Sequence, residues 1–279
     1  MTERIASLTD RRLLAISGPD AAHFLHNIVT CEVEALQPGQ ASFGALLTPQ
    51  GKILFDFFVI RRDDGFLIDV AADKAEDLAK RLAFYRLRAK VTIEPADPQW
   101  QAFAAWGGDV ASDGETVAIA DPRLAQMGHR LYGAVPPQGE PGDYHAHRIA
   151  SGMPQGGLDY AFADAFPHEA LMDQFGGVDF AKGCYVGQEV VSRMQHRGTA
   201  RSRVVMVEGA DPLPEPGAPV AAGGKTAGTM GSSSGRQGLA LVRLDRVHEA
   251  IKANGAVTAG ETPIAVKIQP WARFDWPQD

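Results

Sequence analysis

Residues 182–189 read Lys-Gly-Cys-Tyr-Val-Gly-Gln-Glu and hold the most distinctive chemistry of the chain. They open a basic stretch, because Lys182–Arg203 contains five cations and one anion while the chain has a formal net charge of −7. Such a stretch suits an anionic small molecule, since arginine binds carboxylate and phosphate through paired hydrogen bonds. Charge alone favours the alternative, a solvated helix face with weak ion pairs.

Cys184 is the candidate reactive residue of this stretch. It follows Lys182 by two positions, and glycines flank it at 183 and 187. A nearby ammonium and a helix N-terminus both lower the pKa of a thiol and favour the thiolate. The alternative, a small buried apolar residue, is equally supported by the chemistry. Cys31 has no distinguishing neighbours and is expected to be structural.

The octapeptide resembles the K-G-C-Y-x-G-Q-E signature of the folate-binding YgfZ family. That family includes mitochondrial iron–sulfur assembly homologues and is related to the glycine-cleavage T-protein, an aminomethyltransferase. The similarity extends to Leu46–Lys52, to Asp121-Pro122-Arg123 with Gly128 and Arg130, and to Gly238–Arg243. It therefore covers essentially the whole chain.

The resemblance implies an α+β fold of three parts around a central channel that holds tetrahydrofolate. The parts are an N-terminal α+β domain over 1–95, completed by part of 145–200; a second, ferredoxin-like α+β domain over 96–200; and a C-terminal β-barrel over 201–279. The residue pattern agrees with this, because short apolar segments and Gly-rich turns follow Asp211–Gly217. Helical spacing of Leu78, Leu82, Tyr85 and Leu87 also predicts a helix over 73–87.

The resemblance also implies a site that binds the pterin in an apolar slot and the glutamyl tail with cations. Lys182 and Cys184 would be its functional centre, and no metal ligands are predicted. Tyr185 or Phe166 would stack on the pterin, Glu169 or Glu189 would accept its hydrogen bonds, and Lys182, Arg193 or Arg197 would bind the tail. Gln188 and Asp56 are further candidate contacts. Structural roles for Tyr185 and Glu189, as core aromatic and capping acid, are equally supported.

Two departures from the T-protein pattern bear on function. T-proteins carry an acidic pair where this chain has Phe55-Asp56, and an acid in a segment that here reads Arg148–Met153. Since aminomethyl transfer needs a positioned acid or base, we expect no classical enzyme. The prediction is a tetrahydrofolate-binding accessory protein for assembly or repair of [4Fe–4S] clusters in client enzymes, including tRNA-modifying enzymes, under oxidative stress. The alternatives are a folate-dependent aminomethyltransferase-like one-carbon transferase and a folate-binding or redox-sensing module with a regulatory thiol.

The number of cysteines and the net charge limit which kinds of partner the protein can have. Two cysteines among 279 residues exclude a disulfide framework and a self-contained iron–sulfur site, so any transient cluster must be shared with a carrier or client protein. The net charge argues against direct nucleic-acid binding. Without an apolar run of about 18 residues or a signal-like N-terminus, we expect no membrane contact and a cytoplasmic location.

Two familiar motifs are rejected. Gly224-Lys225-Thr226 resembles the end of a P-loop, but Pro219 stands where the first glycine belongs. Gly231–Gly235 matches G-x-S-x-G without the strand-to-helix setting of a hydrolase, so we expect a flexible turn.

Overall fold

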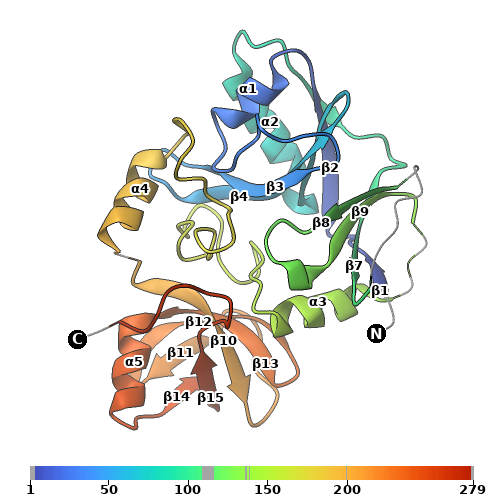
Figure 1. Ribbon diagram of the computed structural model, residues 1–279. Coiled ribbons are helices and arrows are strands. Elements are labelled where there is room, and N and C mark those ends of the chain that lie inside the picture. The colour runs from blue at the N-terminus through green and yellow to red at the C-terminus, as the bar shows by residue number, and fades with distance from the viewer. Residues whose placement is uncertain (1–3, 109–115, 136, 138, 199, 278–279) are drawn as a thin grey trace. The chain divides into compact units, whose positions relative to one another are not determined.

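The computed structural model describes residues 4–108, 116–135, 137, 139–198 and 200–277. Contacts between Cα atoms divide the chain into two compact units. The first comprises Met1–Tyr144 and Phe175–Gln188, and the second comprises His145–Gln174 and Glu189–Asp279. Each unit is built mainly from antiparallel strands with a few short helices (Figure 1).

The larger sheet of the first unit has five antiparallel strands in the order β3-β4-β5-β2-β6. Its strands are β2 (Arg11–Ser17), β3 (Ala41–Leu47), β4 (Ile53–Arg62), β5 (Gly65–Ala71) and β6 (Thr92–Pro95). Two helices, α1 (Ala21–His26) and α2 (Ala75–Arg86), bury Leu25, Leu78 and Leu82 in the same core as the strands. The 3₁₀ turn η1 (Ala72–Lys74) precedes α2. The helix expected over 73–87 is therefore confirmed as η1 and α2.

The smaller sheet of the first unit has the order β1-β7-β9-β8. Its strands are β1 (Arg4–Ser7), β7 (Gln101–Trp106), β8 (Val117–Ala120) and β9 (His129–Gly133), with the 3₁₀ turn η2 (Ala125–Met127) before β9. Its small core consists of Ile5, Phe103, Ala105 and Leu131. Two more helices lie at the boundaries of the units: α3 (Pro141–Ala150) and α4 (Gln188–Arg197).

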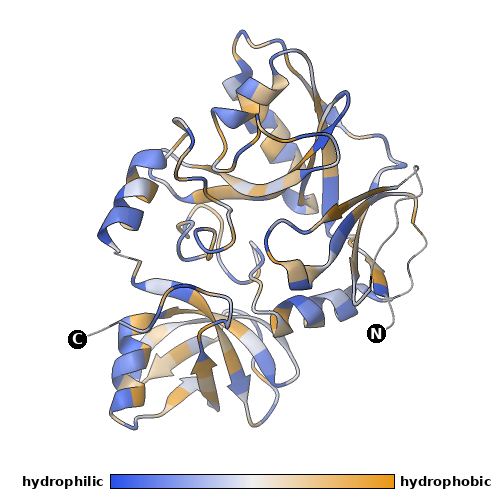
Figure 2. Cartoon of the chain, viewed as in Figure 1, coloured by the Kyte–Doolittle hydropathy of each residue, from blue (hydrophilic) through white to orange (hydrophobic). Residues whose placement is uncertain are grey.

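The second unit contains a closed six-stranded barrel in the order β10-β13-β12-β11-β14-β15. Its strands are β10 (Ser202–Gly209), β11 (Pro219–Ala222), β12 (Lys225–Ser234), β13 (Gln237–Arg243), β14 (Val257–Ala259) and β15 (Thr262–Lys267). The helix α5 (Leu244–Lys252) buries Leu244, Val247 and Ala250 in the barrel core. The strands of both units carry most of the apolar colour, whereas α4 is largely hydrophilic (Figure 2).

The predicted fold class, α+β with a C-terminal β-barrel, is confirmed. The central channel and the three-part boundaries stay predictions. The flexible turn expected over Gly231–Gly235 is wrong, because β12 continues through Ser234. The reason is Asp159, whose Oδ1 accepts hydrogen bonds from the Ser232 amide at 2.7 Å and the Ser232 hydroxyl at 2.6 Å. A buried carboxylate thus replaces a ladder partner where the β12–β13 register shifts.

Candidate functional site

The signature segment belongs to the first unit, where backbone contacts tie it to the loop after α1. The Asp179 amide donates to the Thr30 carbonyl at 2.9 Å. In return the Thr30 hydroxyl donates to the Gly177 carbonyl at 2.6 Å, and its oxygen accepts the Ala45 amide of β3 at 2.8 Å. Thr30 is fully buried, so these hydrogen bonds are shielded from water. The segment is therefore fixed to the sheet before the signature begins.

Lys182 provides the second anchor. Its Nζ lies 2.5 Å from the His26 carbonyl oxygen, 2.8 Å from that of Val29 and 2.9 Å from that of Cys31. An ammonium has three N–H donors, and these three carbonyls take them all. Burial lowers the pKa of Lys182, while Cys31, Glu32 and Asp179 oppose that shift. In this geometry Lys182 has no donor left for a Cys184 thiolate.

Gly187 provides the third anchor, on the other side of Cys184. Its φ is +80°, and a Cβ at this position would lie 2.5 Å from the Thr48 carbonyl oxygen and 3.0 Å from Gly51 Cα. Only glycine satisfies both the backbone conformation and the close approach. The second glycine of the signature therefore seats the segment against the turn between β3 and β4.

Cys184 lies between these anchors and is exposed, whereas Cys31 is buried. Burial raises the pKa of the Cys31 thiol to about 12, and the charge of Lys182 opposes that rise. The cation expected to act on Cys184 thus acts on Cys31, whose carbonyl it also binds. The two cysteines have opposite environments: one is packed and protonated, and the other is presented to solvent on an anchored loop.

Tyr185 is the signature residue with an unsatisfied polar atom. Its side chain is buried, and its hydroxyl has no hydrogen-bond partner among the residues that the structure describes. The Lys182 ammonium lies 5.6 Å from the ring centroid, within cation–π range. Burial raises the pKa of the phenol to about 12, so it remains a donor at neutral pH. A buried hydroxyl without a partner is a candidate for a ligand hydrogen bond.

The remaining candidate folate contacts that follow Tyr185 lie within α4. Gln188 closes the helix start by donating from Nε2 to the Gly183 carbonyl at 3.4 Å. Glu189 and Arg193 are exposed and form an ion pair one helical turn apart. Arg197 is exposed in the last turn. Such exposed pairs contribute little to stability.

Glu169 and Asp56 are further from the signature in the chain. Glu169, in the second unit with Phe166, accepts the Phe166 amide at 2.9 Å and so caps its own turn. Asp56, in the first unit, is buried on β4 opposite Ala45. Its charge helps to raise the pKa of Arg11. The predicted set is therefore divided, with Asp56, Lys182, Cys184, Tyr185 and Gln188 in one unit and Glu169, Glu189, Arg193 and Arg197 in the other.

Sequence reasoning missed a buried ionic cluster in the first unit. Asp69 accepts from Arg11 Nε at 2.6 Å and from the Tyr132 hydroxyl at 3.0 Å, which links β5 and β2 to β9. Asp121 forms a bidentate pair with Arg123 at 2.9 and 2.7 Å. A single carboxylate inside the apolar strand Gly65–Ala71 was the available signal, because an unpaired charge is costly to bury.

The second unit has a buried cluster of its own. Arg148 is 2% exposed and donates to Asp159 at 2.7 Å, to the Ser232 hydroxyl at 2.5 Å and to the Met153 carbonyl at 3.1 Å. The cluster joins α3 to β12 of the barrel. Arg148 is the first residue of the segment in which T-proteins carry an acid. In this chain Arg148 makes structural contacts with Asp159, Ser232 and Met153.

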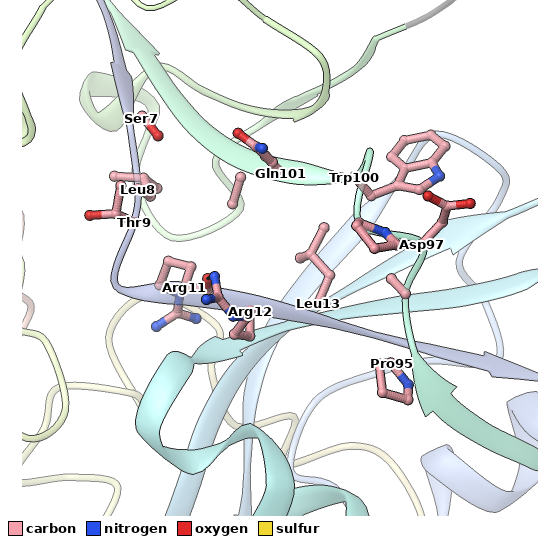
Figure 3. Close-up of a pocket in the computed structure, with 13 residues that line it drawn as sticks. Ser7, Leu8, Thr9, Arg11, Arg12, Leu13, Pro95, Asp97, Trp100 and Gln101 are labelled. Carbon is pink, nitrogen blue, oxygen red and sulfur yellow. Dashed lines mark hydrogen bonds between the residues drawn. The ribbon is translucent and has the colours of Figure 1, made fainter.

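A cavity of about 600 Å³ opens in the first unit between β2 and the turn before β7. Figure 3 shows Arg12 and Leu13 on one wall, with Asp97, Trp100 and Gln101 on the other. None of the predicted site residues lines it. Across the described part of the chain, no group of three or more His, Cys, Asp or Glu side chains is placed to hold a metal ion. No helix described is both long and apolar enough to cross a bilayer.

Comparison with known proteins identifies the family. Residues 7–113 match the GCVT N-terminal domain, and residues 201–274 match the CAF17 C-terminal beta-barrel domain. The chain is 33% identical to the human mitochondrial iron–sulfur cluster assembly factor IBA57, over 97% of this chain and 84% of that protein. The chain belongs to the IBA57 family. The mouse member is 34% identical, over 86% of this chain and 77% of its own length.

The IBA57-family chain also shares its fold with a solved structure. The glycine cleavage system aminomethyltransferase T from Bartonella henselae superposes with a TM-score of 0.75 at 14% identity, covering 99% of this chain and 88% of that one. At this identity the likeness concerns the fold alone. The expected relation to T-proteins and to iron–sulfur assembly homologues is confirmed, and the narrower assignment to a folate-binding branch stays a prediction.

Proposed function

We propose that this protein acts in iron–sulfur cluster assembly, with Cys184 as a transient ligand for a cluster shared with a partner. The observation that carries the proposal is the contrast within the signature: Lys182 and Gly187 are held by backbone atoms, and Cys184 between them is exposed. An exposed thiol on a fixed loop can meet a ligand held by another protein. The similarity to the human iron–sulfur cluster assembly factor supports the same role.

The proposed step is a ligand exchange without redox change. The Cys184 thiol loses its proton to water, and its sulfur forms one iron–thiolate bond. One bond between that iron and a partner thiolate breaks, and the released thiolate takes up a proton. Because Cys184 supplies one sulfur, the partner must keep the other ligands, so the cluster is cargo. The partner is an iron–sulfur carrier or a [4Fe–4S] client enzyme; tRNA-modifying enzymes under oxidative stress, in the cytoplasm, are the clients we infer.

A tetrahydrofolate cofactor is the second part of the proposal. Tyr185 fits such a ligand, since it has a buried ring and a hydroxyl with no protein partner among the described residues. Glu169 fits less well, because its carboxylate already caps the Phe166 amide. Bound folate would supply a reduced pterin, and the Tyr185 hydroxyl would donate a hydrogen bond to it.

Calorimetric titration of the full chain with tetrahydrofolate tests the cofactor. We expect binding that Tyr185→Phe weakens by about tenfold, the value of one buried hydrogen bond. Leu158→Ala, an exposed apolar residue of the second unit, serves as control. If folded wild-type protein gave no heat of binding, the proposal of a tetrahydrofolate cofactor would be wrong. Turnover of an aminomethyl donor would instead establish a one-carbon transferase.

Cluster transfer from a [4Fe–4S]-loaded carrier to an apo-client tests the ligand exchange. We expect the wild-type chain to accelerate transfer and Cys184→Ser to abolish the acceleration, while Cys31→Ala retains it. Equal rates for wild type and Cys184→Ser would contradict the proposed role of the thiol.

A further inference from the structure

A second basic region covers the C-terminal half of α2 and the turn after it, away in sequence from the signature. Residues 80–90 contain five cations, Lys80, Arg81, Arg86, Arg88 and Lys90, and no acid, in a chain of net charge −7. All five are exposed. Within this segment Lys80 pairs with Glu76 of the preceding turn, and Arg86 donates to the Val91 carbonyl at 3.2 Å. The surface therefore remains strongly positive.

Two apolar side chains lie among these cations. Phe84 is 71% exposed and Leu87 is 88% exposed, the two highest values among the exposed large apolar residues described. Phe84 lies in the last turn of α2 and Leu87 caps the helix, while Leu78 and Leu82 are buried in the core. The Phe84 ring meets the half-buried Tyr85 ring edge-on, with centroids 5.7 Å apart. The outward face of α2 thus has apolar side chains ringed by positive charge.

Leu87 also has an unfavourable backbone conformation. It caps α2 with φ +47° and ψ −105°, outside the small left-handed region that non-glycine residues tolerate. The end of α5 shows the usual solution, because Asn254 takes φ +53° there. Leu171 has φ +63° but is fully buried, so its packing offsets the strain. Leu87 has neither a tolerant side chain nor burial to offset this conformation.

We propose that the outward face of α2, centred on Phe84 and Leu87, docks an acidic protein segment that carries apolar side chains. Charge complementarity selects an acidic partner for residues 80–90. Burial of Leu87 on binding would repay both its exposure and its strain. A nucleic acid fits less well, since a base could stack on Phe84 but would leave the more exposed Leu87 uncovered. A membrane also fits less well, since two apolar side chains bury too little area for stable anchoring. This surface uses no residue of the signature.

Selection of random peptides on the full chain tests the surface. A phage-displayed library is panned on the wild-type protein, and recovered peptides are measured by fluorescence anisotropy. We expect Asp and Glu beside Leu or Phe in the peptides, and affinity that falls at least tenfold in Leu87→Gly and in Arg81→Glu/Arg88→Glu. Affinity should also fall as NaCl rises from about 50 to about 300 mM. Ile251→Ser, an exposed apolar residue beside Lys252 on α5, should bind as wild type does.

Leu87→Gly separates binding from folding. Glycine tolerates positive φ, so we expect its melting temperature to rise by about 2 °C while peptide binding falls. Peptides that bind this variant as well as wild type would overturn the proposal. A selection that recovers no acidic peptide would also overturn the proposal. In that case, binding of single-stranded RNA or of phosphatidylcholine–phosphatidylserine vesicles that Leu87→Gly and Arg81→Glu/Arg88→Glu both abolish would assign the surface to a nucleic acid or a membrane.

Discussion

The Lys182 ammonium donates a hydrogen bond to the carbonyl oxygen of Cys31 at 2.9 Å. Together with the carbonyls of His26 and Val29, this contact uses every donor of the cation. The signature lysine therefore binds the loop after α1, and the cysteine two residues later is left exposed. Lys182 acts as a positioning residue for Cys184 in this arrangement, and activation of the thiol by Lys182 would require the ammonium to leave its three carbonyls.

Lys182→Met should destabilise the first unit. The substitution removes three charge-assisted hydrogen bonds and leaves their carbonyls without a donor, so we expect the free energy of unfolding to fall by about 2–3 kcal/mol. Lys225→Met, at an exposed position that begins β12, is the matched control and should change stability by less than about 0.5 kcal/mol. Urea unfolding measures both. Equal effects of the two substitutions would show that the carbonyl contacts do not hold the segment.

Gly187→Ala should disturb the seat of the signature. We expect a loss of about 3 kcal/mol, from the positive φ and from the clash with the Thr48 carbonyl. Gly176 is the matched control, because its φ is +75° and nothing lies within 4 Å of an added Cβ. Gly176→Ala should lose only about 1 kcal/mol. The difference between the two variants in urea unfolding reports the close approach to the β3–β4 turn, and no difference would refute it.

Arg148→Met should be among the most destabilising substitutions in the second unit. It leaves Asp159 as an uncompensated charge at a fully buried position, which costs about 3–5 kcal/mol. Arg193→Met removes the exposed pair with Glu189 and should cost less than about 0.5 kcal/mol. Thermal unfolding of the two variants provides the comparison. A small effect at Arg148 would mean that water reaches Asp159.

Stability should depend on pH through Cys31. Its pKa is raised from 9.0 to about 12, so both states are protonated below pH 9 and the native state alone keeps the proton above it. Stability is therefore lost as pH rises from 9 towards 12, by up to about 1.4 kcal/mol per pH unit. Lys182 has the opposite effect on stability. Because burial lowers its pKa below the usual 10.5, the native state loses the ammonium proton at a lower pH than the unfolded state does, so this group favours the native state as pH rises.

Cys31→Ala isolates the contribution of this thiol. Urea unfolding at several pH values from 8 to about 11 should show a shallower alkaline decline for this variant than for wild type. Cys184→Ala, at the exposed cysteine, serves as the control for loss of a thiol. Parallel curves for wild type and Cys31→Ala would mean that the buried thiol does not titrate as its environment requires.

Local patterns predicted most of the fold. Alternation and Gly-rich turns indicated the barrel strands, and helical spacing indicated α2. The helix α5 was missed, because it follows β13 directly and Arg243 at its start makes no side-chain capping bond. The run of serines before Gly235 resembled a turn, since the carboxylate that holds Ser232 in β12 belongs to Asp159, 73 residues away.

The site was predicted only in part, because some of its contacts join residues that are far apart in the chain. The sequence distinguished Cys184 from Cys31, but the reason it offered was a charge of Lys182 beside Cys184, whereas in the structure that charge lies beside the buried Cys31. The role of Lys182 could not be predicted, because its acceptors are backbone carbonyls 151 to 156 residues away, which no side-chain pattern reveals. The strain at Leu87 is equally hidden, since a leucine ends the helical pattern as an ordinary apolar residue.

The role of Cys184 can be measured in cells that carry Cys184→Ala in place of the wild-type chain, through the activity of their [4Fe–4S] client enzymes. The cells lack any other copy of the protein and are grown under oxidative stress, and Cys31→Ala serves as the control for loss of a thiol. We predict that Cys184→Ala accumulates as folded protein and leaves client activity at the level of the deletion, whereas Cys31→Ala restores it. Full client activity with Cys184→Ala would contradict the assignment of Cys184 as the working residue.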